Sequence, residues 1–371
     1  MGARMSATVP SRLIVAGENT TRIWGLANRE RIERLASKAG VGIKTADATA
    51  LWVNQAYAFD PLWMAHAMAT PRLWVMDGDR PALVRDAEAA LPTAAGAAMT
   101  PPEGATIYRI GDRPVLYNRS LRKQQRPFFE PLTSGNVRRL ERESYYGAYK
   151  GVTDILTKYL WPEIAFHLTR LAAALRMTPN MVTVIGAVGC VLATLFFLHG
   201  NYWAGVAVGF VFMVLDTVDG KLARCTITSS WWGNIFDHGI DLVHPPFWWL
   251  AWASGLSAWG LGYGGTTYAW VIGTILIGYV VQRLIEGWFM RRFGFHIHVW
   301  RKFDSDFRLI TARRNPNMIL LVGSLLFGRP DIGLILVACW TALSLLVHFW
   351  QAFAAEAQAA RGRPVTSWLE N

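Results

Sequence analysis

Six long apolar runs follow one another in the second half of the chain, and they constrain its fold more than any other feature. They lie near 181–199, 202–220, 235–257, 267–290, 316–328 and 331–355. A helix needs about 20 mostly apolar residues to cross a bilayer, and the run at 316–328 is the weakest candidate. We therefore predict a bundle of six transmembrane helices. The alternative is a large soluble protein with unusually apolar core helices.

The charges between these runs predict how the helices are oriented. The first, third and fifth connections contain a single basic residue, Arg329, whereas the second and fourth hold nine Lys and Arg residues. Lys and Arg in short connections remain on the cytoplasmic side of a membrane. A soluble fold would leave this alternation unexplained. We expect a multi-pass integral membrane protein with both termini in the cytoplasm, in a bacterial inner membrane.

The first half of the chain has a different composition. Residues before about Arg176 carry most of the charges, and none of their apolar runs could span a bilayer. We predict a mainly α protein with a cytoplasmic α/β domain at 1–140, interfacial amphipathic helices at 141–178 and a transmembrane domain at 179–371. Pro179 is well placed to begin the first span. The three Cys residues include no CxxC pair, so neither a disulfide framework nor a thiolate metal site is indicated.

Four carboxylates lie where the second and third apolar runs approach the cytoplasmic side: Asp216, Asp219, Asp237 and Asp241. Inserting an ionised Asp into a membrane costs at least about 2.5–3.5 kcal/mol, so such residues indicate function. Spacings of three and four place each pair on one helix face. Four facing carboxylates would repel one another unless cations neutralise them, and hard oxygen ligands select Mg²⁺ or Mn²⁺. We predict a two-metal site. The alternative is that these Asp residues pair with nearby Lys and Arg.

Small and basic residues between the Asp positions favour a phosphate-bearing ligand. Gly220 and Gly233 leave room for a nucleotide or a neighbouring helix to approach the backbone. Ala223 is also small, and the guanidinium of Arg224 could bind a phosphate through two hydrogen bonds.

Together these residues resemble the signature of the CDP-alcohol phosphotransferase family. The pattern is Asp216-x2-Asp219-Gly220-x2-Ala223-Arg224-x8-Gly233-x3-Asp237-x3-Asp241. The stretch TPNMVT at 178–183 is similar to the family's entry into its first helix, and six helices are what the family shows. The resemblance covers roughly 143–355.

The resemblance implies transfer of a substituted phosphate from a CDP-linked donor to an alcohol, with release of CMP. It implies that Asp216, Asp219 and Asp237 bind two divalent metals, and that Asp241 is both a ligand and the base for the acceptor hydroxyl. It further implies that a set of neighbouring residues lines the nucleotide site: Gly220, Ala223, Arg224, Asn180 and Thr183.

The identity of donor and acceptor stays open at this level. The donor is either CDP-diacylglycerol with a polar acceptor or a CDP-polar alcohol with a lipid acceptor, and either would serve phospholipid biosynthesis. An enzyme similar to di-polyol-phosphate synthases, using a soluble CDP-polyol, is an alternative. A non-catalytic nucleotide- or metal-binding regulator and an intramembrane prenyl transferase are others. We expect a membrane environment, no nucleic-acid partner and a chain able to form a homodimer.

The N-terminal half is faintly similar to nucleotidyltransferases, in which a strand leads into a Gly-rich triphosphate loop. Residues 12–41 are predicted to form a strand, a turn and a basic helix, but the run of glycines is missing. Asn54-Gln55-Ala56 stands where those enzymes place a metal-binding Asp. We therefore expect a degenerate domain that has lost this activity, with an unrelated α/β domain as the alternative.

Two basic segments complete the candidates. The loop at 291–315 is expected to recognise a polar acceptor or anionic headgroups, or to be an ordinary cytoplasmic loop, with Arg313 and Arg314 favoured if the acceptor bears a phosphate. The strip at 120–126 is expected to be solvated or to face headgroups. Glu286 is expected to form a buried pair with Arg283.

Overall fold

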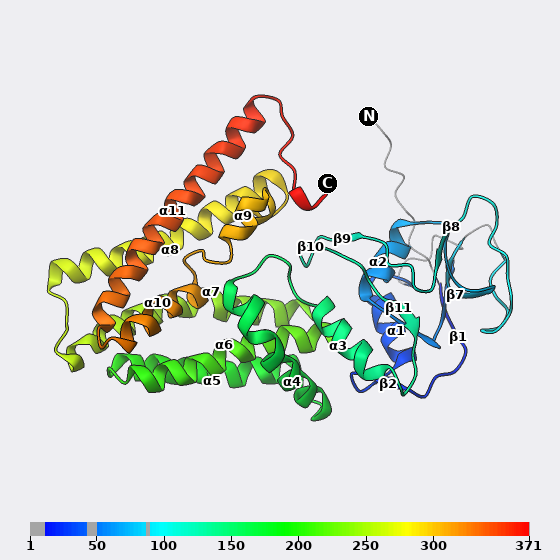
Figure 1. Ribbon diagram of the computed structural model, residues 1–371, viewed down its shortest axis with the longest axis horizontal. Helices are drawn as coiled ribbons and strands as arrows, with labels where there is room; N and C mark the ends of the chain where they lie inside the picture. Colours follow the sequence, from blue (N-terminus) through cyan, green and yellow to red (C-terminus); the bar gives the residue numbers. More distant parts are fainter. Residues whose placement is uncertain (1–11, 43–49, 87–89, 371) are drawn as a thin grey trace.

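The computed structural model describes residues 12–42, 50–86 and 90–370. An α/β region lies at one end of the molecule, and long helices fill the rest (Figure 1). The mainly helical fold with an N-terminal α/β region agrees with the prediction.

The α/β region is built on a mixed five-stranded sheet. Its strand order is β1-β4-β7-β6-β8, with β1–β4 and β6–β8 parallel and the two inner pairs antiparallel. The strands are β1 (Arg12–Ala16), β4 (Ala50–Asn54), β7 (Arg80–Arg85), β6 (Leu73–Asp77) and β8 (Thr106–Arg109). Successive residues of a strand face opposite sides of a sheet. Accordingly, Leu51 and Val53 contribute to one core cluster and Trp52 to another.

Helices and small hairpins complete this region. The helices α1 (Asn28–Lys38) and α2 (Pro61–Ala69) pack Ile32 and Trp63 into the same core cluster as Val53. Three two-stranded sheets join β2 (Arg22–Ile23) to β3 (Leu26–Ala27), β5 (Tyr57–Phe59) to β11 (Phe129–Pro131), and β9 (Leu116–Asn118) to β10 (Lys123–Gln125). The strand at 12–16 and the helix at 28–38 confirm the elements predicted within 12–41.

Short helical segments connect the two parts of the molecule. They are α3 (Val137–Gly147), the π-helical turn η1 (Leu156–Leu160) and α4 (Trp161–Ala174). α4 packs against α6, and α3 contacts both. The predicted amphipathic segment at 141–178 is therefore helical in large part.

Helices occupy all six positions of the apolar runs. They are α5 (Pro179–Leu198), α6 (Tyr202–Cys225), α7 (Trp231–Gly255), α8 (Gly265–Phe293), α10 (Arg314–Leu326) and α11 (Pro330–Ala360), with the 3-10 turn η2 (Leu256–Trp259) after α7. The segment at 291–315, expected as a loop, contains the 3-10 turn η3 (Ile297–Val299) and the short helix α9 (Lys302–Phe307). A last turn, η4 (Trp368–Glu370), ends the described chain.

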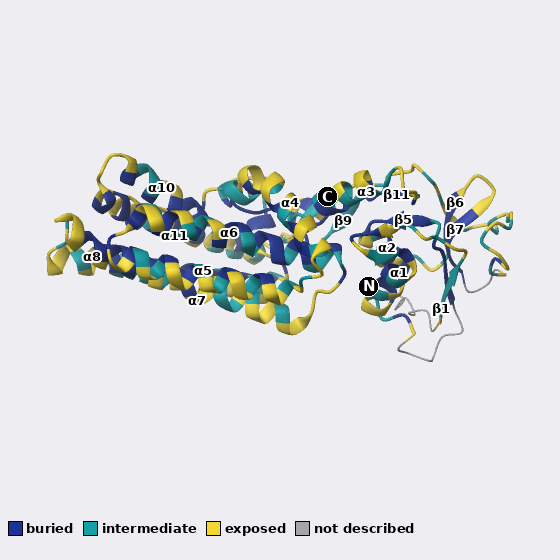
Figure 2. Cartoon of the chain, turned by 90° about the horizontal axis from the view of Figure 1, so that it is seen from below, coloured by how far each residue is buried: buried dark blue, intermediate teal, exposed yellow. Residues whose placement is uncertain are grey.

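Three described helices are both long enough and apolar enough to cross a membrane: α5, α8 and α11. Large apolar side chains on their outer faces, such as Val188, Ile277 and Leu346, are exposed. Figure 2 shows exposed residues, in yellow, along the length of the long helices. A soluble monomer rarely exposes so much apolar surface, so the faces are suited to lipid. Of the other three predicted spans, α10 has only 13 residues, and α6 and α7 carry the four Asp residues.

Local sequence sets where the site-bearing helices begin and end. The Thr178 hydroxyl accepts a hydrogen bond from the Met181 amide at 3.2 Å, and Pro179 fills the first helical position of α5. Ser230 caps α7 in the same way, with its hydroxyl 3.0 Å from the Gly233 amide. Five residues, 226–230, separate α6 from α7.

Candidate active site

Three of the four predicted metal-binding carboxylates come together where α6 meets α7. Carboxylate oxygens of Asp216, Asp237 and Asp241 all lie within 4.8 Å of one another. Asp216 is on α6, while Asp237 and Asp241 stand one turn apart on α7. The two helix faces predicted from the three- and four-residue spacings therefore meet.

Asp219 lies beside this group rather than within it. Its side chain is buried, with 3% exposed, and it accepts a hydrogen bond from the Thr183 hydroxyl at 2.6 Å. The backbone amide of Gly220 also donates to it. Thr183, predicted to line the nucleotide site from α5, thus positions one of the predicted metal ligands.

Arg314, at the start of α10, bridges two of the clustered carboxylates. Its guanidinium donates to Asp216 at 2.7 Å and to Asp241 at 2.9 Å. Arg314 was predicted as a partner for an acceptor phosphate, and the structure places it on the carboxylates instead. One guanidinium neutralises only part of the charge of four ionised Asp residues. An oxygen-only ligand set with excess negative charge fits hard divalent cations such as Mg²⁺.

Two cavities meet at the carboxylates. The larger, of about 940 Å³, is lined by Asp219 and by predicted nucleotide-site residues: Asn180, Thr183, Gly220 and Ala223. The smaller, of about 530 Å³, is lined by Asp216 and Asp241. Gly220 and Asp237 line both. The carboxylates therefore stand at the junction of the two spaces.

Two signature glycines lie where a Cβ would crowd neighbouring side chains. A Cβ on Gly233 would lie 3.0 Å from the Ser230 hydroxyl and 3.2 Å from the Asn180 side-chain oxygen. A Cβ on Gly220 would lie 3.1 Å from a terminal nitrogen of Arg224, which lines the smaller cavity and not the larger. The glycines thus permit close contact between the helix backbones and the side chains of the site.

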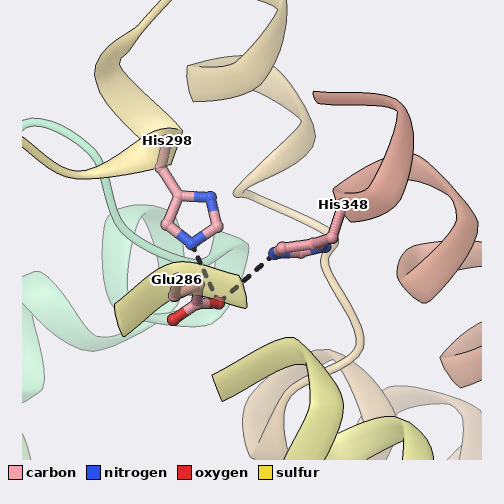
Figure 3. Close-up of side chains that lie close together, drawn as sticks. All are labelled: Glu286, His298 and His348. Carbon is pink, nitrogen blue, oxygen red and sulfur yellow. Dashed lines mark hydrogen bonds and ion pairs between the residues drawn. The ribbon is translucent and has the colours of Figure 1, made fainter. Parts of the chain in front are cut away.

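A second cluster borders the smaller cavity (Figure 3). The side chains of His298 and His348 point at Glu286, with Nε2 atoms 3.2 Å and 3.3 Å from its Oε1. Arg283 lies 3.1 Å from the same oxygen, as the predicted pair requires, and Arg313 donates to both carboxylate oxygens at 2.6 Å and 2.5 Å. Burial lowers the pKa of His298 and keeps it neutral. Two guanidiniums already neutralise this carboxylate, so the cluster is better suited to holding η3, α8 and α11 together than to binding a dication.

Two further cavity-lining residues lie outside the signature. Arg122, in the turn between β9 and β10, and Lys150, after α3, both line the smaller cavity. The strip at 120–126 was expected to be solvated or to face headgroups, whereas Arg122 lines this cavity. Neither residue could be predicted from sequence periodicity, because tertiary folding is what brings the β9–β10 turn close to the helices.

The family comparison agrees with this geometry. Residues 176–350 match the sequence model described as CDP-alcohol phosphatidyltransferase. This segment belongs to the CDP-alcohol phosphatidyltransferase family. The matched residues include all four Asp residues, and Arg122 and Lys150 precede them.

Curated relatives of the chain include cholinephosphotransferases. Human cholinephosphotransferase 1 is 34% identical over 135 residues, covering 33% of this chain and 32% of the relative. The zebrafish (Danio rerio) protein of the same name is 32% identical over 129 residues, covering 32% of each chain. The aligned part thus spans about a third of the length of these relatives.

A solved structure with similarity to the chain is the phosphatidylinositol phosphate synthase of Mycobacterium tuberculosis with CDP-DAG bound. It shows 16% identity and a TM-score of 0.41, covering 52% of this chain and 94% of that one. A second structure of that synthase, in complex with manganese and citrate, has the same identity and TM-score and covers 50% and 87%.

Proposed function

We propose that this chain is an integral membrane enzyme of phospholipid synthesis. It transfers a substituted phosphate from a CDP-linked donor to the hydroxyl of an acceptor alcohol and releases CMP. The observation that carries the proposal is the position of the four Asp residues at the junction of two cavities. One cavity then holds the cytidine diphosphate ester, and the other holds the acceptor.

The residues at the junction of the two cavities would have different roles in the transfer reaction. Asp216, Asp219 and Asp237 would hold two divalent cations, Mg²⁺ or Mn²⁺, which when bound neutralise charge on the donor pyrophosphate and on departing CMP. Thr183 orients Asp219 through its hydrogen bond. Asn180 and Gly233 shape the wall of the nucleotide cavity.

Asp241 is the proposed base, and it is also close enough to the cluster to serve as a ligand. Its side chain is 44% exposed and lines only the smaller cavity, so an acceptor hydroxyl can reach it. As the acceptor oxygen forms its bond to phosphorus, Asp241 takes the hydroxyl proton, and the bond from phosphorus to the CMP oxygen breaks.

We infer that all six helices lie in the membrane, with both termini and the site on the cytoplasmic side. The exposed apolar faces of α5, α8 and α11 and the alternating charge of the connections support this arrangement. The proposed division is a cytoplasmic domain at 1–140, interfacial helices at 141–178 and the transmembrane domain at 179–371.

We also infer that the N-terminal domain has no nucleotidyltransferase activity. At the end of β4, the Asn54 side chain donates to the Ala95 carbonyl at 3.0 Å, and the Gln55 side chain donates to the Gly17 carbonyl. Amide side chains hold this loop together, at the place where a metal-binding carboxylate would be needed. The region from 1 to 140 then serves docking, assembly or, as developed below, the acceptor cavity.

The activity is tested by following CMP release from purified full-length protein in detergent. Mixtures contain Mg²⁺ and either CDP-diacylglycerol with polar alcohols or CDP-alcohols with a lipid extract. Asp241→Asn should abolish transfer but keep metal-dependent donor binding. Asp306→Asn is the matched control, because Asp306 is exposed and lines neither cavity. A regulator without turnover would bind the donor and release no CMP in any mixture.

A further inference from the structure

The smaller cavity contains more positive charge than its carboxylates can neutralise. Eight Lys and Arg side chains line it, against five Asp and Glu side chains. Three of those five are the clustered Asp residues, which the proposed function assigns to metals and to the base. The other two already have partners: Glu286 binds Arg283 and Arg313, and Asp154 accepts a hydrogen bond from Asn315 at 3.0 Å.

Five of the eight cations form no ion pair among the described residues: Arg122, Lys150, Lys221, Arg224 and Arg308. Arg122 and Lys150 are the two of these five that precede the family segment at 176–350. Neither has a carboxylate within ion-pair distance among the described residues, 12–42, 50–86 and 90–370. Both side chains are partly buried. Burial, and then the charge of Arg313, lowers the pKa of Arg122 to about 10. Burial, and then the charges of Arg122 and Arg224, lowers the pKa of Lys150 to about 8.

The backbone conformation of Arg122 is also energetically unfavourable. Its φ is +53°, in the left-handed region that residues with a side chain seldom adopt. Backbone strain and close like charges both destabilise the fold, and such features persist mainly at functional sites. A bound anion would remove the electrostatic part of this cost.

We propose that the acceptor alcohol carries a phosphate, and that Arg122 and Lys150 bind it. The proposal rests on the proposed function and names its acceptor class. Other cations of the cavity, including Arg308 with two buried nitrogens that have no partner among the described residues, add to the attraction. A neutral acceptor such as diacylglycerol would leave these charges uncompensated. Both positions precede residues 176–350, so the N-terminal part of the chain supplies acceptor specificity to a family domain.

The phosphate could belong to a soluble compound or to a lipid, and paired acceptors separate these sources. Full-length protein with Mg²⁺ and CDP-diacylglycerol is given glycerol 3-phosphate or glycerol, and inositol 1-phosphate or inositol. In the lipid arm, CDP-glycerol is given with 1-acylglycerol 3-phosphate or with monoacylglycerol. CMP release should require the phosphorylated member in at least one pair. Equal rates with the unphosphorylated member would overturn the inference while leaving the proposed function intact.

Variants test the two side chains directly. Arg122→Gln and Lys150→Gln should each raise the KM for the phosphorylated acceptor about tenfold to a hundredfold, the usual effect of losing one hydrogen bond to a charged group. The KM for the donor should change little. Arg126→Gln is the matched control, because Arg126 is exposed, four residues from Arg122, and outside the cavity. An unchanged acceptor KM in both cavity variants would refute the assignment.

If no mixture releases CMP, the proposed function is wrong. Binding of a phosphorylated alcohol to Arg122 and Lys150 can still be measured by thermal unfolding. Glycerol 3-phosphate, but not glycerol, should raise the thermal midpoint of the wild-type protein and of Arg126→Gln. The shift should be lost in Arg122→Gln and Lys150→Gln. Without anion, these two variants should melt at or above the wild-type midpoint, because each removes a like charge. A lower midpoint with an unchanged shift would show a structural role and overturn the inference.

Discussion

Arg314 offers the sharpest test of the electrostatics of the carboxylate cluster. Its side chain is 11% exposed and binds Asp216 and Asp241 at 2.7 Å and 2.9 Å. Hydrogen bonds to charged groups contribute about 1.5–3 kcal/mol each, but Asp241 is partly exposed, so its bond counts at the low end. Arg314→Gln also leaves the remaining carboxylates to repel one another. We expect a loss of about 3–5 kcal/mol of stability in the absence of divalent metal.

Arg329 provides a matched control for this substitution. It binds Asp331 through the same pair of distances, 2.9 Å and 2.7 Å, but its side chain is 51% exposed. Its partner Asp331 is 12% exposed, but solvent around the Arg329 guanidinium screens the pair, so Arg329→Gln should cost only about 0–1 kcal/mol. The two Arg residues therefore form hydrogen bonds of the same lengths, but Arg329 is more exposed and binds one carboxylate where Arg314 binds two.

The assay is thermal unfolding followed by Trp fluorescence in detergent, in excess chelator and then in Mg²⁺. In chelator, Arg314→Gln should melt several degrees below the wild-type protein, while Arg329→Gln should not. Mg²⁺ should raise the midpoint of Arg314→Gln more than that of the wild type, because divalent cations replace the missing positive charge. Equal midpoints in chelator, or equal responses to Mg²⁺, would refute the view that Arg314 neutralises the carboxylates.

Three further predictions concern turnover. Excess chelator should stop CMP release, and added Mg²⁺ or Mn²⁺ should restore it; activity that persists in chelator would contradict a metal site. Gly233→Ala should lower kcat/KM for the donor at least severalfold by crowding Asn180, whereas Gly239→Ala, whose Cβ would meet nothing within 4 Å, should not; equal values would remove the packing role. Because the pKa of Lys150 is lowered to about 8, its amine loses its charge as the pH rises through 8, and the KM for a phosphorylated acceptor should rise there. A flat KM between pH 7 and 9 would contradict this role for Lys150.

The parts of the site that follow from local spacing were predictable. Asp216 and Asp219 fall on one face of α6, and Asp237 and Asp241 on one face of α7, because a helix repeats every 3.6 residues. The start of α5 at Pro179 follows from its cap. The positions of all six helices were predicted from the long apolar runs. How many of them cross a bilayer is not fixed by periodicity, and only α5, α8 and α11 meet the criteria of length and apolarity.

The parts that depend on tertiary contacts were not predictable. Arg314 is 98 residues from Asp216 in sequence, and His348 is 62 from Glu286. Spacing carries no information at such separations. The basic strip at 120–126 has a composition typical of a solvated surface, and only the left-handed backbone of Arg122 and the position of its turn bring it to the cavity.

The charges that line the cavities come from both the family segment and the N-terminal part of the chain. The carboxylates on α6 and α7 require cations, and Arg314 supplies only one positive charge. The lining of the smaller cavity also contains Arg122 and Lys150, whose positive charge no described carboxylate pairs. Because Asp241 lines the same cavity, an acceptor that carries both a phosphate and a hydroxyl would neutralise Arg122 and Lys150 and supply the hydroxyl to Asp241. The family segment alone supplies the first set of charges, so removing the N-terminal part should change which acceptor is used before it changes how the donor is cleaved.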